Sequence, residues 1–196
     1  MLSDGDIIQS IKTGDIKIEP FDPNMVRSCS YDLKLGRGFK VLKVNTKEKR
    51  VNLPDWSTVQ ATNSKIVLRD KTTWYYEDID SSTYDIPPHS GILATTKEII
   101  TLSPNICAYV SGRSSIGRLF LEVEQTAGFI EAGFSGNVTL ELVNNTDFFM
   151  EINEDDVISQ IVFHTLDTPC FMPYGDPRVK SRYQNQRGTT GSRYES

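Results

Sequence analysis

Two short stretches carry residue types that could perform chemistry on a nucleotide. The first, residues 112–118, reads GRSSIGR and places two guanidinium groups and two hydroxyls in one glycine-bounded loop. Backbone N–H groups and arginine forks both match phosphate oxygens, so this stretch predicts a phosphate cradle. The second, residues 138–142, alternates apolar residues with Thr139 and Glu141, as a half-buried strand does. We therefore expect the Glu141 carboxylate to face away from the core and toward a site.

The cysteines and histidines lack the spacing of a zinc site. Cys29, Cys107 and Cys170 are far apart, form no Cys-x-x-Cys pair and stand in no ligand spacing with His89 or His164. Zinc-dependent nucleobase deaminases need a His-x-Glu and a Pro-Cys-x-x-Cys sequence, and neither occurs here. We therefore expect reduced thiols and, for any deamination, a water activated without zinc.

These two stretches and four others resemble the dCTP deaminase branch of the dUTPase superfamily, and are most similar to its archaeal bifunctional type. The motifs occur in the family's order: SCSYDLKLG at 28–36, GRSSIGR at 112–118, TAGFIEAGFSG at 126–136, TLE at 139–141, SQ at 159–160 and YQNQRG at 183–188. The resemblance implies zinc-independent hydrolytic deamination of dCTP to dUTP and ammonia. Three alternatives stay open: a bifunctional dCTP deaminase and dUTP diphosphatase that forms dUMP, a dUTPase, and a non-catalytic nucleotide-binding regulator.

The resemblance assigns catalytic roles to four residues. Glu141 matches the family's glutamate that takes a proton from water and returns it to the leaving amine, a role worth about 10²–10⁴ in rate. Ser114 and the backbone carbonyl of Ala127 match the groups that hold this water. Arg118 matches the arginine whose charge keeps that glutamate ionised, and one helical turn would place it on the same face as Ser114. The simpler alternatives are a surface strand glutamate and a solvated arginine.

The resemblance also implies a nucleotide-binding set from the loop, the strand and the C-terminal region. Its members are Arg113, Ser114, Ser115, Ile116, Gly117, Arg118, Glu131, Thr139, Leu140, Glu141, Gln160, Tyr174, Arg182 and Gln186. Arg113 and Ser115 would engage phosphates; the open alternative is a glycine-bounded turn with an exposed arginine. Gln160 is expected to be buried, with either the ligand or a backbone group as its partner. Arg182 stands where many relatives carry lysine, which keeps the charge and changes the donor geometry.

Two acids depart from the family pattern, and a third has two interpretations. Glu131 stands where the family usually has an aspartate close to the sugar 3′-hydroxyl. Because a shift of about 1 Å can cost on the order of 10²-fold in rate, the longer side chain leaves diphosphatase activity open. Glu124 stands where related sequences often carry histidine. Asp32 would lie near the triphosphate by resemblance, whereas the simpler interpretation is a solvated strand face.

The expected ligands and partners follow from the same resemblance and from the charge. Mg²⁺ would arrive with the triphosphate, held by phosphate oxygens and water without a direct protein ligand. The resemblance implies a homotrimer with sites between subunits, and leaves open inhibition by dTTP. A formal net charge of −5 argues against a general nucleic-acid partner. The sequence has no apolar run long enough to span a bilayer and starts with an acidic, polar stretch, so we expect a cytoplasmic protein with no membrane partner.

The elements that must position these residues are predicted to be mostly strands. Residues 3–13 predict a helix, with Ser3 as N-cap and Gly14 as terminator. Turn signals separate short predicted strands at 39–44, 65–68, 91–96, 106–110, 138–143 and 157–164. This pattern favours an all-β sandwich or barrel with short helices. The resemblance sharpens it to the distorted jelly-roll β-barrel of the dUTPase fold.

The chain length favours one domain over residues 1–196. Residues 177–196 are expected to form a flexible C-terminal lid that orders over the ligand. Residues 37–85 carry no visible chemistry and are interpreted as an insertion that packs on the barrel or contacts a neighbouring subunit. Trp74 and Tyr75 are the residues we expect at such a contact, since aromatic side chains are enriched in interface cores.

Overall fold

The computed structural model describes residues 1–44, 66, 70 and 72–194. Most of its elements are strands, and the helices are short. In chain order they are α1 (Asp4–Thr13), β1 (Ile16–Glu19), the 3-10 helix η1 (Pro23–Met25), β2 (Tyr31–Lys34), β3 (Phe39–Val44), β4 (Trp74–Ile79), β5 (Thr83–Ile86), β6 (Ser90–Leu102), β7 (Ile106–Gly112), α2 (Ser114–Gly117), β8 (Leu121–Glu122), β9 (Phe129–Ile130), β10 (Ser135–Asn144), β11 (Met150–Asn153) and β12 (Val157–Thr165).

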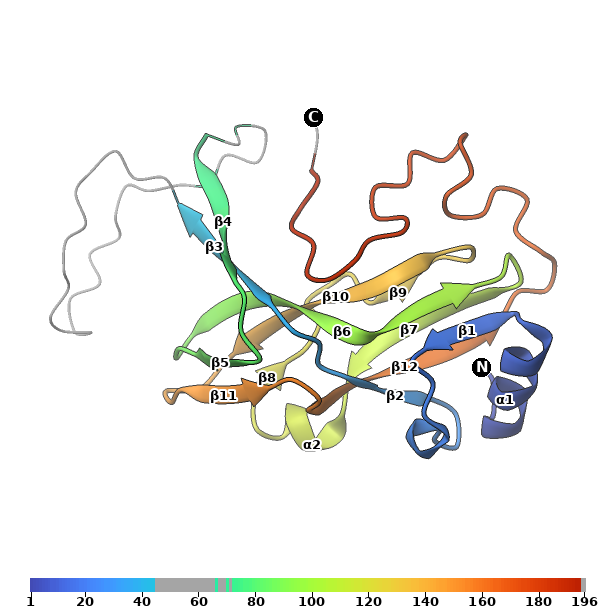
Figure 1. Cartoon of the computed structure of the whole chain (residues 1–196), viewed down its shortest axis with the longest axis horizontal. Helices are drawn as coiled ribbons and strands as arrows, with labels where there is room; N and C mark the ends of the chain where they lie inside the picture. The colour runs from blue at the N-terminus through green and yellow to red at the C-terminus, as the bar shows by residue number, and fades with distance from the viewer. Residues whose placement is uncertain (45–65, 67–69, 71, 195–196) are drawn as a thin grey trace, which may run out of the picture.

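Two main sheets and a two-stranded ribbon form the body of the molecule (Figure 1). The larger sheet has the order β4-β3-β6-β10-β8, with β1 also paired to β6; the smaller has the order β2-β12-β7-β9; and β5 pairs with β11. The pairings between these strands are antiparallel. The predicted all-β class is confirmed. The sheets stay separate instead of closing into one barrel, which agrees with a distorted jelly roll.

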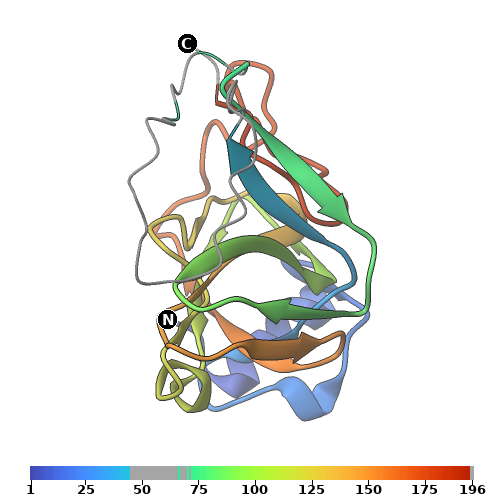
Figure 2. The same cartoon turned by 90° about the vertical axis from the view of Figure 1, so that its left-hand side faces the viewer.

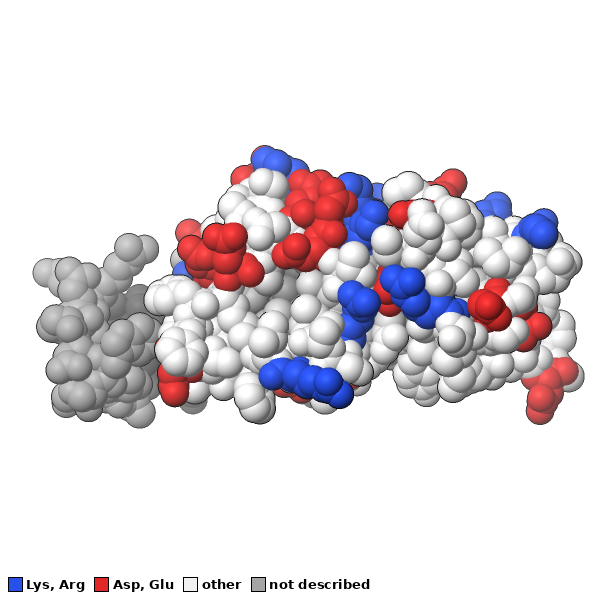
Figure 3. All heavy atoms as spheres, turned by 90° about the horizontal axis from the view of Figure 1, so that it is seen from below, with Lys and Arg blue, Asp and Glu red and all other residues white. Residues whose placement is uncertain are grey.

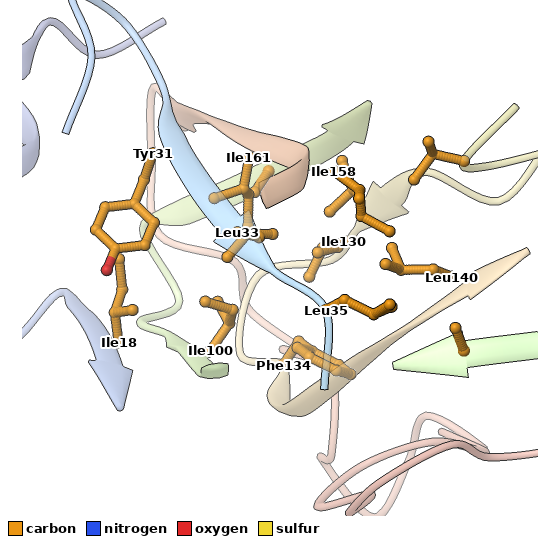
Figure 4. Packing of buried hydrophobic residues seen from close by; sticks show 14 of the residues in the cluster. Ile18, Tyr31, Leu33, Leu35, Ile100, Ile130, Phe134, Leu140, Ile158 and Ile161 are labelled. Carbon is orange, nitrogen blue, oxygen red and sulfur yellow. The ribbon is translucent and has the colours of Figure 1, made fainter. Parts of the chain in front are cut away.

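The core lies between the two main sheets (Figure 4). Leu33 from β2, Ile161 from β12 and Leu140 from β10 are each at most 1% exposed, and Figure 4 shows them in one cluster. Burial of such apolar side chains is the main force that fixes the strands against one another. Because side chains alternate along a strand, anchoring Leu140 inward turns Thr139 and Glu141 to the opposite face of β10.

Helix α1 begins and ends at the residues that the sequence predicts. The Ser3 hydroxyl accepts a hydrogen bond from the Asp6 backbone N–H, and the Asp6 carboxylate accepts one from the Ser3 N–H, which completes a capping box. Gly14 ends the helix with a φ of 84°, a left-handed conformation that glycine adopts without strain. Of the predicted apolar face, Ile7 is fully buried and the other isoleucines are partly buried. The helix lies beside β1 at one end of the body (Figure 1).

Strands β6 and β10 pair with one irregularity, which Asn137 fills. Asn137 is opposite Ile99 while Thr139 is opposite Thr95, so two residues of β10 span four residues of β6. The Asn137 side-chain amide donates hydrogen bonds to the carbonyls of Thr96 and Glu98, at 3.0 and 3.1 Å. A bulge of this kind leaves backbone carbonyls without strand partners, and this side chain satisfies them. The number of extra residues in β6 at this irregularity is even, so the alternation of faces along β10 is preserved.

The β3–β4 hairpin projects away from the sheets (Figures 1 and 2). In β3 only Lys40 has a register partner in β6, Leu93, whereas all of β3 pairs with β4. The predicted strand 39–44 is confirmed, whereas most of the predicted strand 65–68 lies outside the described residues. Trp74 is only 8% exposed within its own chain, so the expectation that it serves a subunit interface is wrong. Tyr75 is 47% exposed and keeps surface for a partner.

One buried charge stands next to the bulge. Glu98 is 2% exposed, and both of its carboxylate oxygens accept the Lys34 backbone N–H, at 3.1 and 3.3 Å. Burial raises the pKa of Glu98 above its ordinary value, because the ionised carboxylate loses hydration. The backbone N–H groups of Glu98 and Lys34 and the charges of Lys34 and Lys97 replace it only in part. The fold therefore carries a carboxyl group that favours its protonated form.

This burial predicts a pH-dependent cost. Below the ordinary pKa of 4.5 the carboxyl is protonated in both folded and unfolded chains. Above it the unfolded chain loses the proton first, so the contribution of Glu98 to the free energy of unfolding falls as pH rises through the folded pKa. We expect the melting temperature of Glu98→Gln to gain on that of the wild type between pH 4.5 and 7. Thermal melts of both proteins across this range check it, and a pH-independent difference would contradict it.

Candidate active site

A pocket of about 410 Å³ opens between β10, the hairpin and the C-terminal segment. Six of the residues predicted to form the site line it: Ala127, Glu131, Thr139, Glu141, Tyr174 and Gln186. Seven aromatic or aliphatic side chains that the sequence did not single out for the site also line it: Tyr76, Leu93, Phe129, Ile130, Phe134, Val138 and Tyr183. An apolar wall with a few polar groups is the usual character of a small-molecule site.

Glu141 is placed in the pocket by the alternation of β10. It is partly buried, and its Oε2 accepts a hydrogen bond of 3.2 Å from the Gln125 backbone N–H. The Glu141 backbone N–H donates to the Val123 carbonyl at 3.2 Å. These two bonds tie the acid to residues 123–125, just before Ala127, whose surface lines the same pocket. The arrangement fixes one carboxylate oxygen, and the other has no hydrogen-bond partner within the described part of the chain.

The C-terminal segment lies across this pocket in an ordered conformation. Gln186 forms a parallel bridge with Gly136, and its side-chain amide donates to the Asn137 carbonyl at 2.6 Å. The Gly188 N–H donates to Asn137 Oδ1 at 3.1 Å. Glycine is required at residue 136, where φ is 154° and a Cβ would lie 3.0 Å from Gln186. The flexible lid predicted at 177–196 therefore contacts β10 through Gln186 and Gly188, and its opening stays a prediction.

Tyr174 supports the same segment, whereas Arg182 does not reach the pocket. The Tyr174 hydroxyl accepts a hydrogen bond from the Tyr183 N–H at 2.9 Å, and its ring lies 5.9 Å from that of Phe134. Arg182 is exposed, and its guanidinium donates to the Arg193 carbonyl at 3.3 Å. Leu140, although predicted in the nucleotide-binding set, points into the core, so only its backbone can face a ligand.

The predicted phosphate loop forms a second cluster, away from the pocket. Arg113 precedes α2, and its guanidinium donates to the Val157 carbonyl at 3.1 Å and lies 3.4 Å from the Asp32 carboxylate. Asp32 is 1% exposed and also pairs with Arg27 at 2.7 Å. The alternative that Asp32 belongs to a solvated strand face is therefore wrong. A buried carboxylate between two arginines holds Arg113 in a fixed orientation beside the loop.

Gln160 belongs to this second cluster. Its side-chain amide donates to the Gly112 carbonyl at 3.4 Å, and its Oε1 accepts a bond of 3.3 Å from the Ser30 hydroxyl. It is opposite Asp32 in β2 and Ser111 in β7. These are the backbone and side-chain partners that a partly buried amide needs, so Gln160 braces the start of the loop.

The α2 turn itself presents its polar groups outward. The Arg118 N–H donates to the Ser114 carbonyl at 3.1 Å, as the predicted single helical turn requires. Ser114, Ser115, Gly117 and Arg118 are exposed, and Ile116 is partly buried. Within the part of the chain that the structure describes, no hydrogen bond or ion pair engages the side chains of the two serines or of Arg118. The turn is thus available to a ligand or to another copy.

One chain does not bring the two clusters together. Figure 1 places α2 at the bottom of the molecule and the C-terminal segment at the top. Figure 3, which views the molecule from below, shows Lys and Arg side chains near the middle of the face on that side. None of the α2 residues lines the pocket. Ser114 and Arg118 therefore do not meet Glu141 within a single chain.

Comparison with known proteins places the chain in a family. Residues 1–166 match the family described as dCTP deaminase-like. The chain belongs to the dCTP deaminase-like family. It is 37% identical over 193 residues to the "dCTP deaminase, dUMP-forming" of a Nocardioides species, which is 98% of this chain and 94% of the relative. The protein of the same name from Streptomyces avermitilis shows the same identity and coverage. The family resemblance inferred from the motifs is confirmed.

A solved structure of the family supports the fold. The 2′-deoxycytidine 5′-triphosphate deaminase from Agrobacterium tumefaciens matches with a TM-score of 0.58 and 21% identity, covering 84% of this chain and 48% of that chain. This likeness shows that the two proteins share the arrangement of their strands.

The described side chains bear on two further expectations, a bound metal ion and a membrane span. Across the described residues, no group of three or more His, Cys, Asp or Glu side chains is placed to hold a metal ion. The exposed α2 turn offers hydroxyls and guanidinium groups, which match phosphate oxygens. In the same described part, no helix is long and apolar enough to cross a membrane.

Proposed function

We propose that this protein deaminates dCTP by hydrolysis and carries the product on to dUMP. The observation that carries the proposal is Glu141, a strand carboxylate that is held by a backbone N–H and faces a mostly apolar pocket. The relatives that are 37% identical over 98% of the chain are named for dUMP formation. These names support the bifunctional alternative better than the first expectation, in which dUTP is the final product.

The first step needs one base and one bound water. The water oxygen adds to C4 of the cytosine ring while the Glu141 carboxylate accepts its proton. The proton is returned to the exocyclic nitrogen, the C4–N4 bond breaks, and ammonia leaves, so that dCTP and water give dUTP and ammonia. The Ala127 carbonyl is proposed to accept a hydrogen bond from this water, because Ala127 lines the same pocket as Glu141.

The second step is hydrolysis of dUTP and water to dUMP and diphosphate. Glu131 is exposed at the pocket and is the acid proposed to orient the attacking water there. Mg²⁺ arriving with the triphosphate would supply charge neutralisation for the leaving diphosphate. The arginines and serines of the α2 loop are proposed to bind the phosphates themselves.

The complete site is proposed to form between copies in a homotrimer. The α2 turn of one copy, with Ser114 and Arg118, would meet the pocket of another that contains Glu141. This is supported by the separation of the two clusters in one chain and by the exposed side chains of α2. The non-catalytic regulator remains the competing proposal, and it predicts nucleotide binding without turnover. Cytoplasmic location and the response to dTTP stay predictions.

Product analysis tests the proposed function. With dCTP and Mg²⁺ we expect equal amounts of ammonia, diphosphate and dUMP, with dUTP accepted as a separate substrate. Glu131→Gln should lower diphosphate release on the order of 10²-fold, because the water loses its orienting carboxylate, while ammonia release continues and dUTP accumulates. Accumulation of dUTP with the wild type would instead show that deamination is the only activity. Glu151→Gln, an exposed strand glutamate outside the pocket, is the matched control.

A further inference from the structure

The β3–β4 hairpin brings one aromatic side chain back to the pocket. Tyr76 in β4 is opposite Leu42 in β3, beyond Lys40, the one β3 residue with a register partner in β6. The hairpin thus carries Tyr76 clear of the sheet, yet the side chain lines the pocket that contains Glu141. Its ring is braced from behind by Trp74, at 5.7 Å and an interplanar angle of 82°. Tyr76 is therefore a supported wall of the site and not a loose surface group.

The C-terminal segment lies directly on this ring. A Cβ at Gly191 would fall 2.7 Å from two ring carbons of Tyr76, and the three nearest atoms to that position all belong to Tyr76. Only a residue without a side chain lets the backbone approach an aromatic face so closely. The Ser192 N–H also points to the Tyr76 hydroxyl at 3.4 Å, which is a long and weak hydrogen bond. The ring carbons of Tyr76 therefore lie closer to the segment than its hydroxyl does.

Neighbouring contacts place the segment between the hairpin and β10. The Thr189 hydroxyl donates to the Gly38 carbonyl at the base of the hairpin, at 2.6 Å. The Thr190 N–H donates to the Thr139 hydroxyl, two residues before Glu141, at 3.3 Å. Figure 2 shows the segment running beside β4. Residues 189–192 are thus held on one side by the pocket strand and on the other by the hairpin.

We propose that Tyr76 is a positioning residue that seats Gly191 and Ser192 and so holds the C-terminal segment closed over the pocket of Glu141. The inference rests on the proposed function, because it assigns the hairpin a part in nucleotide retention. It also gives a reason for a glycine at residue 191: the segment closes only where the backbone can come this near to the ring. The ring acts through the segment and takes no part in proton transfer.

A double-mutant comparison of Tyr76→Ala and Gly191→Ala tests the contact. Each single substitution should raise KM for dCTP about three- to tenfold, the range expected for losing one aromatic contact, and should change kcat less than KM. In the Tyr76→Ala background the Gly191→Ala substitution should have no further effect, because the added methyl group no longer meets a ring. Multiplying effects would overturn the proposal. Tyr76→Phe keeps the ring and should raise KM less than Tyr76→Ala does; an equal rise in both variants would also overturn the proposal.

Amide hydrogen exchange without nucleotide separates this proposal from the proposed function. The amides of residues 188–194 should exchange about three- to tenfold faster in both single variants than in the wild type, since the closed segment opens more often. Glu77→Gln, which changes an exposed side chain on the other face of β4 and outside the pocket, should leave both exchange and KM unchanged. Unaltered exchange in Tyr76→Ala would overturn the proposal even if dCTP is turned over. Faster exchange in a protein that does not convert dCTP would support the contact and refute the proposed function alone.

Discussion

Glu141→Gln is expected to lower kcat for dCTP deamination by about 10²–10⁴-fold, the contribution of a positioned general base. The amide keeps the size of the side chain and an oxygen that can accept the Gln125 N–H, so the pocket should keep its shape. KM for dCTP should stay close to that of the wild type. Ammonia release measured at several dCTP concentrations gives both constants.

The control for this substitution is an exposed strand glutamate elsewhere in the fold. Glu151 in β11 lies outside the pocket, and Glu151→Gln should leave both constants unchanged. Equal melting temperatures for the two variants would show that the loss is not a folding defect. If Glu141→Gln deaminates dCTP at the wild-type rate, Glu141 has no catalytic role. If the wild type itself binds dCTP and releases no ammonia, the regulator alternative is favoured.

A mixture of two inactive variants is expected to recover activity. Glu141→Gln damages the pocket of its own copy, and Arg118→Ala damages the α2 turn that would serve another copy. Both variants are co-expressed in equal amounts. A site between subunits is then intact only where the pocket comes from an Arg118→Ala chain, which keeps Glu141, and the turn comes from a Glu141→Gln chain, which keeps Arg118. Random assembly into cyclic trimers makes that combination in about a quarter of the sites. Ammonia release from the purified mixed oligomer should thus be about a quarter of that of the wild type.

The recovery has a strict control. The double variant Glu141→Gln, Arg118→Ala mixed with Glu141→Gln contains no intact pocket, so it should stay inactive at every ratio. The two variants should also stay inactive when each is first assembled into its own oligomer and the two oligomers are then mixed without exchange of subunits. No recovery in co-expressed oligomers that contain both chains would mean that the site is built within one chain.

Local patterns in the sequence predict α1, β3, β6, β7, β10 and β12 and the face of Glu141, but they do not predict β4, β5 or β11. The alternation at 138–142 predicts both the strand and the outward face of Glu141, because a strand turns successive side chains to opposite sides. The helix at 3–13 follows from its cap and its apolar face. Ala127, Thr139 and Tyr174 line the pocket as the family motifs imply.

The distances in space between the motifs could not be predicted from local patterns in the sequence. Nothing in residues 112–118 indicates that the α2 turn lies away from Glu141. This separation arises because β7, which precedes α2, and β10, which carries Glu141, belong to different sheets. The sequence leaves open whether Asp32 faces solvent or a site. Its two ion-pair partners are Arg27 and Arg113, and Arg113 is distant in sequence. Tyr76 belongs to no motif of the family, and only its contact with Gly191 reveals it.

The pairing of β10 with β6 has a consequence for how this lineage can change. The irregularity that Asn137 fills is even, so Leu140 stays in the core and Glu141 stays in the pocket. Loss or gain of a single codon between Asn137 and Glu141 would exchange those two faces and bury the acid in hydrocarbon. Natural variants of this strand should therefore differ by replacement and keep their length, while indels accumulate in loops that set no register.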